Sequence, residues 1–260
     1  MAETPQQQAQ SSEKRVRAVA IIPARYASTR FPGKPLVHIA GRPMIEHVYR
    51  RASQAKLVDE VWVATDDARI FATVEAFGGR VLMTRDDHPS GTDRIAEAAE
   101  HLQCDVVVNV QGDEPLLEPD EIDAVVAPFA ANPELVMTTA ATPITDPADA
   151  AAPSVVKVVV DRDGYALYFS RLPLPYYRSG SGAHLKHLGL YAYRKTFLQR
   201  YAALVPTPLE QAEALEQLRV LENGYRILVV PTPHDAVSVD VPEDLERVRR
   251  LVDGAANGGG

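Results

Sequence analysis

The 260-residue sequence contains only one cysteine, Cys104, which excludes an intrachain disulfide and is typical of a protein from a reducing compartment. We expect this cysteine to serve packing rather than catalysis. The sequence has no apolar run of the roughly 18 residues that would cross a membrane. It carries 27 Lys and Arg against 35 Asp and Glu, and the net charge of −8 argues against a nucleic-acid partner, whose phosphates need broad neutralisation. A cytoplasmic protein without a membrane or nucleic-acid partner is therefore expected.

What is present is the composition of a globular domain, with a hydrophobic fraction of 46%. Residues 1–14 are rich in Gln and Ser and lack the apolar segment of a signal peptide, so a disordered tail is expected there. Residues 254–260 are low in complexity and are expected to fray. A single domain over residues 15–253 would lie between the two tails.

Segments of strand and helix type alternate along the first part of this domain. Short apolar runs predict buried strands, and amphipathic stretches predict helices. The strands are expected at 16–22, 60–65, 81–84, 106–110 and 135–142, and the helices at 43–56, 68–77, 92–103 and 120–131. This alternation predicts an α/β fold with an open, doubly wound, mainly parallel sheet.

The pattern changes after about residue 150. Two apolar segments, 155–160 and 165–170, flank Asp161-Arg162-Asp163-Gly164, which is typical of a hairpin turn. Residues 187–193 alternate like a further strand. We therefore interpret residues 155–193 as a β-rich insertion, whose apolar strands need a covering partner and would form a dimer interface. The first pattern is expected to resume with helices at 196–203, 208–221 and 242–252 and strands at 226–230 and 236–239.

The first predicted strand leads into a cationic loop. This loop holds Arg25, Arg30 and Lys34 together with Gly33 and several prolines. Proline stiffens a loop, and glycine lets the backbone approach a ligand closely. At the carboxyl end of a core strand, such a loop suits a polyanion such as a triphosphate, with a solvated basic turn as the alternative. It is neither a Walker A loop nor a dinucleotide fingerprint.

Two aspartates follow predicted strands that are far apart in the sequence. Asp113 stands in Gln-Gly-Asp after residues 106–110, and Asp240 follows residues 236–239. A carboxylate beside a triphosphate is repulsive unless a cation lies between them, and hard oxygen ligands next to phosphates suit Mg²⁺. The alternatives are a turn acid for Asp113 and a helix-capping role for Asp240. The pair favours a metal site more strongly than either residue alone.

A loop of small residues, from Asp87 to Arg94, joins a predicted strand to a predicted helix. Its small residues permit a flat base to pack against the backbone. The alternative is an ordinary capped loop, with Asp93 in the first helical turn and Arg94 exposed.

Several motifs occur together in this chain. They are Pro-Ala-Arg at 23–25, Phe-Pro-Gly-Lys-Pro-Leu at 31–36, Gln-Gly-Asp-Glu-Pro at 111–115, His-Leu-Gly-Leu-Tyr at 187–191, Leu-Glu-Gln-Leu-Arg at 215–219 and Val-Asp-x-Pro-Glu-Asp-Leu at 239–245. In this combination the sequence resembles the 3-deoxy-manno-octulosonate (Kdo) cytidylyltransferases, from about residue 16 to residue 252.

The resemblance implies a fold of the nucleotide-diphospho-sugar transferase type and a Mg²⁺-dependent homodimer in the cytoplasm. Its substrates would be CTP and Kdo, and its products CMP-Kdo for lipopolysaccharide synthesis and pyrophosphate. The catalytic residues implied are Arg25, Lys34, Asp113 and Asp240, the last two as metal ligands. The nucleotide-binding residues implied are Pro23, Ala24, Arg25, Lys34, Ser90, Gly91 and Gln111, and the sugar-binding residues are Arg171, His187, Glu216 and Gln217.

Other interpretations stay open at this point. A related enzyme could activate another acidic sugar, such as a nonulosonic acid, although residues 186–191 disfavour it. A nucleotide-binding regulator without turnover is the second alternative, and the paired aspartates argue against it. Among the sugar-binding candidates, His187 could be a structural histidine, and Glu216 and Gln217 could form a solvated helix face.

Overall fold

The computed structural model describes residues 15–27, 31–179, 182–235 and 237–257. The tail expected at residues 1–14 and Arg30 of the cationic loop lie outside the described residues. In the described part of the chain, no helix is long and apolar enough to cross a membrane. The Cys104 thiol is half-buried and packs against the core, and burial raises its pKa, as suits a packing residue.

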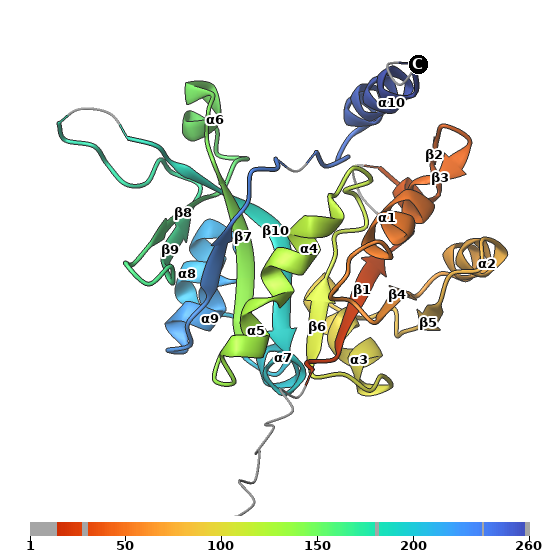
Figure 1. Ribbon diagram of the computed structural model, residues 1–260, viewed down its shortest axis with the longest axis horizontal. Helices are drawn as coiled ribbons and strands as arrows, with labels where there is room; N and C mark the ends of the chain where they lie inside the picture. Colours follow the sequence, from red (N-terminus) through yellow and green to blue (C-terminus); the bar gives the residue numbers. More distant parts are fainter. Residues whose placement is uncertain (1–14, 28–30, 180–181, 236, 258–260) are drawn as a thin grey trace, which may run out of the picture.

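One mixed sheet forms the centre of the molecule (Figure 1). Its strand order is β11 (Leu228–Pro231), β7 (Met137–Pro143), β10 (Leu185–Arg194), β6 (Val106–Asn109), β1 (Ala18–Ala24), β4 (Glu60–Thr65) and β5 (Val81–Met83). β1 pairs in parallel with β4 and β6, β4 with β5, and β7 with β11. Only β10 runs antiparallel to its neighbours β6 and β7 in this order. The prediction of an open, mainly parallel α/β sheet is confirmed.

Helices cover both faces of the sheet, which explains the continuous apolar runs of its inner strands. All of β6 is buried, as is all of β1 except Pro23. On one face, Ile22 and Val108 pack with α1 (Met44–Ala52) and α4 (Pro119–Val126). On the other face, Ile21 and Val107 pack with α3 (Gly91–Glu100) and α7 (Lys195–Ala202).

Two predicted helices are each divided in the structure. The helix expected at 120–131 is α4 followed by α5 (Pro128–Ala131), because Pro128 has no N–H to continue α4. The helix expected at 208–221 is α8 (Pro208–Glu213) followed by α9 (Leu218–Glu222). Between them Ala214 has a φ of 51°, a left-handed conformation that ends α8. The break places residues 215–217 in a connection rather than on a helix face.

The predicted hairpin is confirmed, but the range assigned to the insertion is too long. β8 (Lys157–Val160) and β9 (Ala166–Ser170) pair antiparallel, and β8 also pairs with the start of β10. β10 itself lies between β6 and β7, so residues 187–193 belong to the central sheet. The alternating pattern identified a strand but carried no information about its partners.

The elements without a counterpart in the sequence prediction are short: η1 (Lys34–Leu36), β2 (His38–Ile39), β3 (Arg42–Pro43) and α6 (Pro147–Ala151). Helix α2 (Ala68–Ala76) agrees with its prediction within one residue. The strand expected at 236–239 is wrong for the described residues 237–239, which form no strand. Helix α10 (Pro242–Asn257) continues past its predicted end at Val252.

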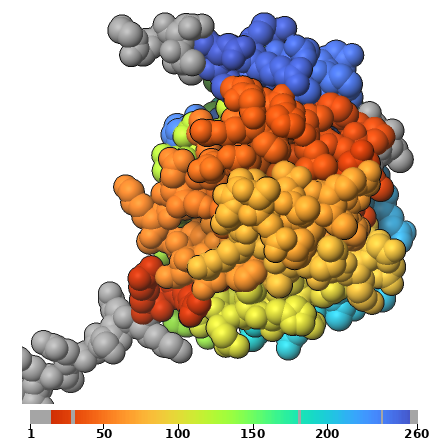
Figure 2. Space-filling model, turned by 90° about the vertical axis from the view of Figure 1, so that its right-hand side faces the viewer, coloured from red at the N-terminus to blue at the C-terminus, as the bar shows by residue number. Residues whose placement is uncertain are grey.

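Helix α10 packs on a part of the chain some 200 residues earlier, the β2–β3 hairpin. Leu245 and Val248 of the helix share a core cluster with Ile39 and Met44. Arg249 also donates through Nη2 to the His38 carbonyl oxygen at 2.6 Å. Figure 2 shows α10, in blue, resting on the red-orange segment that contains this hairpin. The helix that follows Asp240 is thereby fixed beside the end of β1.

Candidate active site

Lys34, Asp113 and Asp240 meet at the edge of the sheet where the parallel strands end. Lys34 Nζ donates to Asp113 Oδ2 at 2.7 Å and lies 3.6 Å from Asp240 Oδ1. All three side chains are partly exposed. In open α/β sheets, ligands bind at this edge, beyond the carboxyl ends of the strands. The predicted association of the cationic loop with the two aspartates is therefore present.

Two glycines allow the backbone to reach this arrangement. Gly33 has a φ of 72°, and its N–H donates to the Tyr26 carbonyl oxygen at 2.9 Å, which turns the chain so that η1 begins at Lys34. Gly112 passes so close to the end of β1 that a Cβ atom there would lie 3.0 Å from the Pro23 carbonyl oxygen. The side chain missing at 112 lets Asp113 approach the cationic loop.

Asp240 reaches the site on an irregular segment rather than at the end of a strand. The Val239 N–H donates to the Asp113 carbonyl oxygen at 2.9 Å, which fixes the segment against the loop after β6. Asp244, in the first turn of α10, reaches back to the residues before the helix, and its Oδ2 accepts from the N–H groups of Asp240 and Val241 at 3.0 and 3.1 Å. These bonds hold the backbone at Asp240, whose carboxylate lies beside Lys34.

The donor set fits a magnesium ion that binds together with a nucleotide. The described residues contain no group of three or more His, Cys, Asp or Glu side chains that could hold a metal ion. Asp113 and Asp240, however, already gather around one cation, the Lys34 ammonium group. Mg²⁺ commonly takes one or two carboxylates and completes its shell with phosphate oxygens and water. Two carboxylates therefore suffice for such an ion.

Arg25 joins the loop after β1 to the loop before α3. Its Nη2 donates to the carbonyl oxygens of His88 and Ser90 at 2.5 and 2.9 Å. Burial, with the nearby Arg94 charge, lowers the pKa of Arg25. On the same side, Gly91 lies against Pro23, since a Cβ atom at 91 would be 3.5 Å from Pro23 Cγ. The structure thus brings the predicted residues Pro23, Ala24, Arg25, Ser90 and Gly91 together.

The loop before α3 is also a helix cap, so its two interpretations are compatible. Ser90 Oγ accepts from the Asp93 N–H at 3.2 Å at the start of α3. The capped-loop alternative is wrong in placing Arg94 in solvent, because this side chain is fully buried. Arg94 donates to Thr84 Oγ1 at 2.5 Å and to Asp66 Oδ2 at 2.6 Å. Asp66, after β4, supplies the opposite charge for the buried guanidinium group, and Thr84, after β5, supplies a second acceptor.

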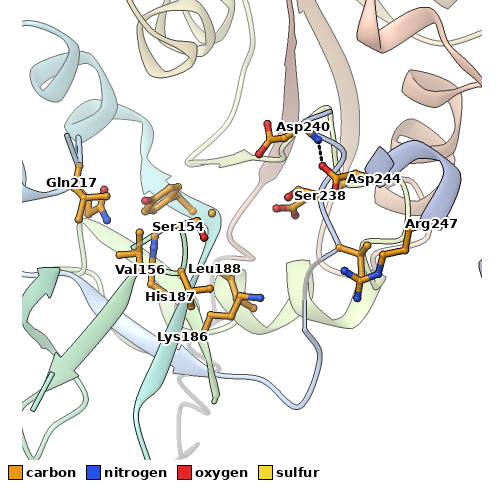
Figure 3. Close-up of a pocket in the computed structure, with 16 residues that line it drawn as sticks. Ser154, Val156, Lys186, His187, Leu188, Gln217, Ser238, Asp240, Asp244 and Arg247 are labelled. Atoms are coloured by element: carbon orange, nitrogen blue, oxygen red, sulfur yellow. Dashed lines mark hydrogen bonds between the residues drawn. The ribbon is translucent and has the colours of Figure 1, made fainter. Parts of the chain in front are cut away.

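A cleft of about 560 Å³ opens beside Asp240 (Figure 3). Gln111 ties β6 to the β10 wall of this cleft, because its Nε2 donates to the Gly189 carbonyl oxygen at 2.8 Å. The polar and charged residues that line it include Glu114, Lys186, His187, Gln217, Ser238 and Arg247. The cleft thus contains two of the four predicted sugar-binding residues, His187 and Gln217.

His187 is a neutral histidine. Its ring is buried, and burial lowers its pKa to about 3. Nε2 lies 3.0 Å from Thr139 Oγ1, and that hydroxyl is also 2.9 Å from the Leu190 carbonyl oxygen, to which it must donate. The hydroxyl therefore accepts from Nε2–H, which leaves Nδ1 as an acceptor. His187 can accept a hydrogen bond from a sugar hydroxyl, but it cannot supply positive charge.

Arg171 and Glu216 do not belong to the described lining of the cleft. The Arg171 guanidinium donates to the carbonyl oxygens of Pro153, Glu213 and Ala214 at 3.0, 2.8 and 3.2 Å. Glu216 accepts from Ser90 Oγ at 3.0 Å and Thr92 Oγ1 at 2.9 Å, and burial raises its pKa. In this structure both side chains bind other parts of the chain.

Four charged residues in the cleft were not predicted as site residues: Glu114, Lys186, Asp244 and Arg247. Glu114 is buried, and burial together with the Asp113 charge raises its pKa to about 8. It directly follows Asp113, and Lys186 directly precedes His187, so proximity in sequence could have indicated both. Arg247 lies three residues after Asp244, on the same face of α10.

The fold and this edge-of-sheet site define a nucleotide-binding transferase of the cytidylyltransferase class. A family model described as cytidylyltransferase matches residues 19–227. The fold is shared with a cytidylyltransferase from Leptospira borgpetersenii, at a TM-score of 0.62 and 16% identity over 92% of this chain and 87% of that chain.

More similar relatives narrow the class. The 3-deoxy-manno-octulosonate cytidylyltransferase of Geobacter sulfurreducens is 56% identical over 88% of this chain and 96% of its own length. That of Solibacter usitatus is 51% identical over 90% and 94%. A solved CMP:2-keto-3-deoxy-manno-octonic acid synthetase complexed with CTP matches at a TM-score of 0.89 and 47% identity, over 92% of this chain and 99% of that one. The chain belongs to the 3-deoxy-manno-octulosonate cytidylyltransferase family.

Proposed function

We propose that this protein transfers the cytidylyl group of CTP to Kdo, with Mg²⁺ as cofactor, and releases CMP-Kdo and pyrophosphate. The relatives that carry this name support the substrates. The structural observation that carries the proposal is the meeting of Lys34, Asp113 and Asp240 beside a cleft at the carboxyl edge of the sheet. The homodimer, the cytoplasmic location and the supply of CMP-Kdo to lipopolysaccharide synthesis are parts of the same proposal.

The reaction needs positioning and charge neutralisation rather than a covalent intermediate. The anomeric hydroxyl oxygen of the sugar bonds to the α-phosphorus, the bond from that phosphorus to the β-phosphate bridging oxygen breaks, and the hydroxyl proton leaves to solvent. Asp113 and Asp240 would hold Mg²⁺, which when bound offsets charge on the phosphates. The Lys34 ammonium group lies between these two carboxylates in the free protein and would turn to the triphosphate when the nucleotide binds.

The loops that Arg25 joins would hold the base. Pro23 and Gly91 approach each other closely there, so the base must fit against backbone and small side chains. Such a site excludes purines by size, and hydrogen bonds to the exocyclic group would separate cytosine from uracil, because an unmatched buried polar group is costly. We expect CTP to be used in preference to UTP and ATP.

The test is pyrophosphate release with CTP, UTP or ATP in combination with Kdo, a nonulosonic acid and a neutral sugar. Turnover that requires CTP, Kdo and Mg²⁺ supports the proposal. If the nonulosonic acid is the only sugar that supports turnover, the protein is a related cytidylyltransferase that activates another acidic sugar. Nucleotide binding without any pyrophosphate release would make it a regulator. Equal rates with CTP and ATP would contradict the proposed base site.

A further inference from the structure

An acidic sugar has to bring its carboxylate into a cleft that already contains three acids. Although burial raises the pKa of Glu114 to about 8 and leaves it largely uncharged, Asp240 and Asp244 also line the cleft, so an incoming anion needs a cation there. Arg171, which the family resemblance suggested, is engaged with backbone carbonyls outside the described lining, and His187 is neutral. Within the described lining, the permanent cations are Lys186 and Arg247.

These two cations differ in what they already bind. Lys186 Nζ forms an ion pair with Asp235 Oδ1 at 2.5 Å, so much of its charge is neutralised within the protein. Arg247 is exposed, and in the part of the chain that the structure describes its guanidinium group has no ion-pair or hydrogen-bond partner. Figure 3 shows the two side chains extending into the cleft from opposite walls. Arg247 is thus the cation that a ligand can engage without breaking an existing pair.

The position of Arg247 also fits the chemistry of the sugar. In a 2-keto sugar acid, the carboxylate is attached to the anomeric carbon, so its receptor must lie near the reacting phosphate. Arg247 lies three residues after Asp244, which accepts the Asp240 N–H at 3.0 Å, so its helix face adjoins the proposed metal site. Packing of Leu245 and Val248 fixes the helix, while the arginine fork remains available for a bidentate carboxylate contact.

We propose that Arg247 binds the carboxylate of the sugar and gives the site its preference for acidic over neutral sugars. This inference rests on the proposed function. It assigns a specificity role to α10 in addition to the role of Asp240 just before that helix.

The experiment compares Arg247→Ala, Arg247→Lys and Lys186→Ala with the unaltered protein. The matched control is Arg250→Ala, an exposed arginine on the same helix outside the cleft lining. KM and kcat are measured for CTP, for Kdo and for an analogue whose carboxylate is replaced by a neutral amide. Arg247→Ala should raise the KM for Kdo about 10- to 100-fold, the range of a charge-assisted contact, and leave the KM for CTP within about twofold.

The ratio of acid to amide turnover separates this role from a structural one. It should fall in Arg247→Ala, recover in part in Arg247→Lys and stay unchanged in Arg250→Ala. If Arg247→Ala weakens acid and amide equally, or if Lys186→Ala alone lowers the ratio, the inference is wrong. Failure of the unaltered protein to use Kdo would instead contradict the proposed function, so the two failures are distinguishable.

Discussion

Lys34 is expected to have different ionic partners in the free and the substrate-bound protein. In the free protein its ammonium group forms ion pairs with Asp113 and Asp240, and in the proposed complex it faces the triphosphate and the leaving pyrophosphate. Replacing it removes positive charge where negative charge develops. A positioned charge of this kind contributes roughly 2–4 kcal/mol to a transition state.

We therefore expect Lys34→Ala to lower kcat far more than it raises the KM for Kdo. Steady-state kinetics in both substrates checks this, with Lys56→Ala, an exposed lysine outside the cleft lining, as the control. A variant with normal kcat and weakened Kdo binding would place Lys34 on the sugar instead.

Asp113 and Asp240 are expected to act as one metal-binding unit. Asp113→Asn and Asp240→Asn should each fold normally and lose most activity, because either loss displaces the ion. The double variant should be little worse than either single variant, since groups that act together are not additive. The measurement is kcat/KM for all three variants across a Mg²⁺ titration. If the losses of kcat/KM in the two single variants multiply in the double variant, or if Asp240→Asn is nearly fully active, Asp240 has a structural role instead.

Some of this residue-level detail could be predicted and some could not. Lys34 and Asp113 follow the core strands β1 and β6, so sheet topology brings both to one edge. Asp240 arrives on an irregular segment, which the hydrogen bond from the Val239 N–H to the Asp113 carbonyl oxygen holds there. The partners of Arg94, Arg171 and Glu216 could not be predicted, because the carboxylate, carbonyls and hydroxyls that bind them belong to other segments of the chain. A charged residue in a motif therefore predicted a binding role but not the group to which its side chain binds.

At the scale of elements, the break between α8 and α9 decides what Glu216 does. The connection directs its carboxylate to Ser90 and Thr92 at the start of α3, while the next residue, Gln217, lines the cleft. The segment thus links the loop proposed for the base to the wall proposed for the sugar.

From this link we expect different effects from two substitutions at Glu216. Glu216→Ala should lower Tm and raise the KM for CTP, because the buried Thr92 hydroxyl loses its acceptor and the Ser90 hydroxyl loses one of its two. Glu216→Gln should keep both near normal, since an amide can still accept one hydrogen bond and burial already disfavours the charged carboxylate, as its raised pKa indicates. Thermal unfolding and CTP kinetics test this. An effect of Glu216→Ala confined to the KM for Kdo would support the sugar contact that the family resemblance implied.

The elements also show where sequence patterns are informative. Apolar runs located β1, β4 and β6 within two residues of their ends, because burial on both faces requires such runs. Residues 237–239 are as apolar as a strand but contact only one backbone group of the loop after β6. An apolar segment is predicted to be buried. To form a strand it also needs a neighbouring segment with free backbone hydrogen-bonding groups, and the local sequence pattern does not show whether one is present.

At the scale of the whole molecule, the surface around β9 exposes large apolar side chains. Leu167 on β9 is 62% exposed, and Leu172 and Tyr176 on the segment that follows β9 are 68% and 87% exposed. Exposed apolar groups that gather in this way are typical of an interface. We propose that this surface, within the predicted insertion, joins two copies of the protein.

We accordingly expect Leu172→Asp combined with Tyr176→Asp to convert a dimer into monomers. Light scattering over a concentration series measures the mass. The control is Val205→Asp, which alters another exposed apolar residue in the connection between α7 and α8. A dimer that persists in the double variant, or a monomer in the unaltered protein, would contradict this surface as the interface.

The position of β10 in the sheet affects folding during translation. During synthesis β1, β4, β5 and β6 emerge first and can pair with one another, and β7 follows them. The strand that joins β6 to β7 emerges only with Leu185–Arg194. Until then both strands present an open edge on which foreign strands can add. The nascent chain is therefore most prone to aggregate while residues 144–194 are being translated. The proposed catalytic edge, drawn from both sides of β10, is among the last parts to assemble.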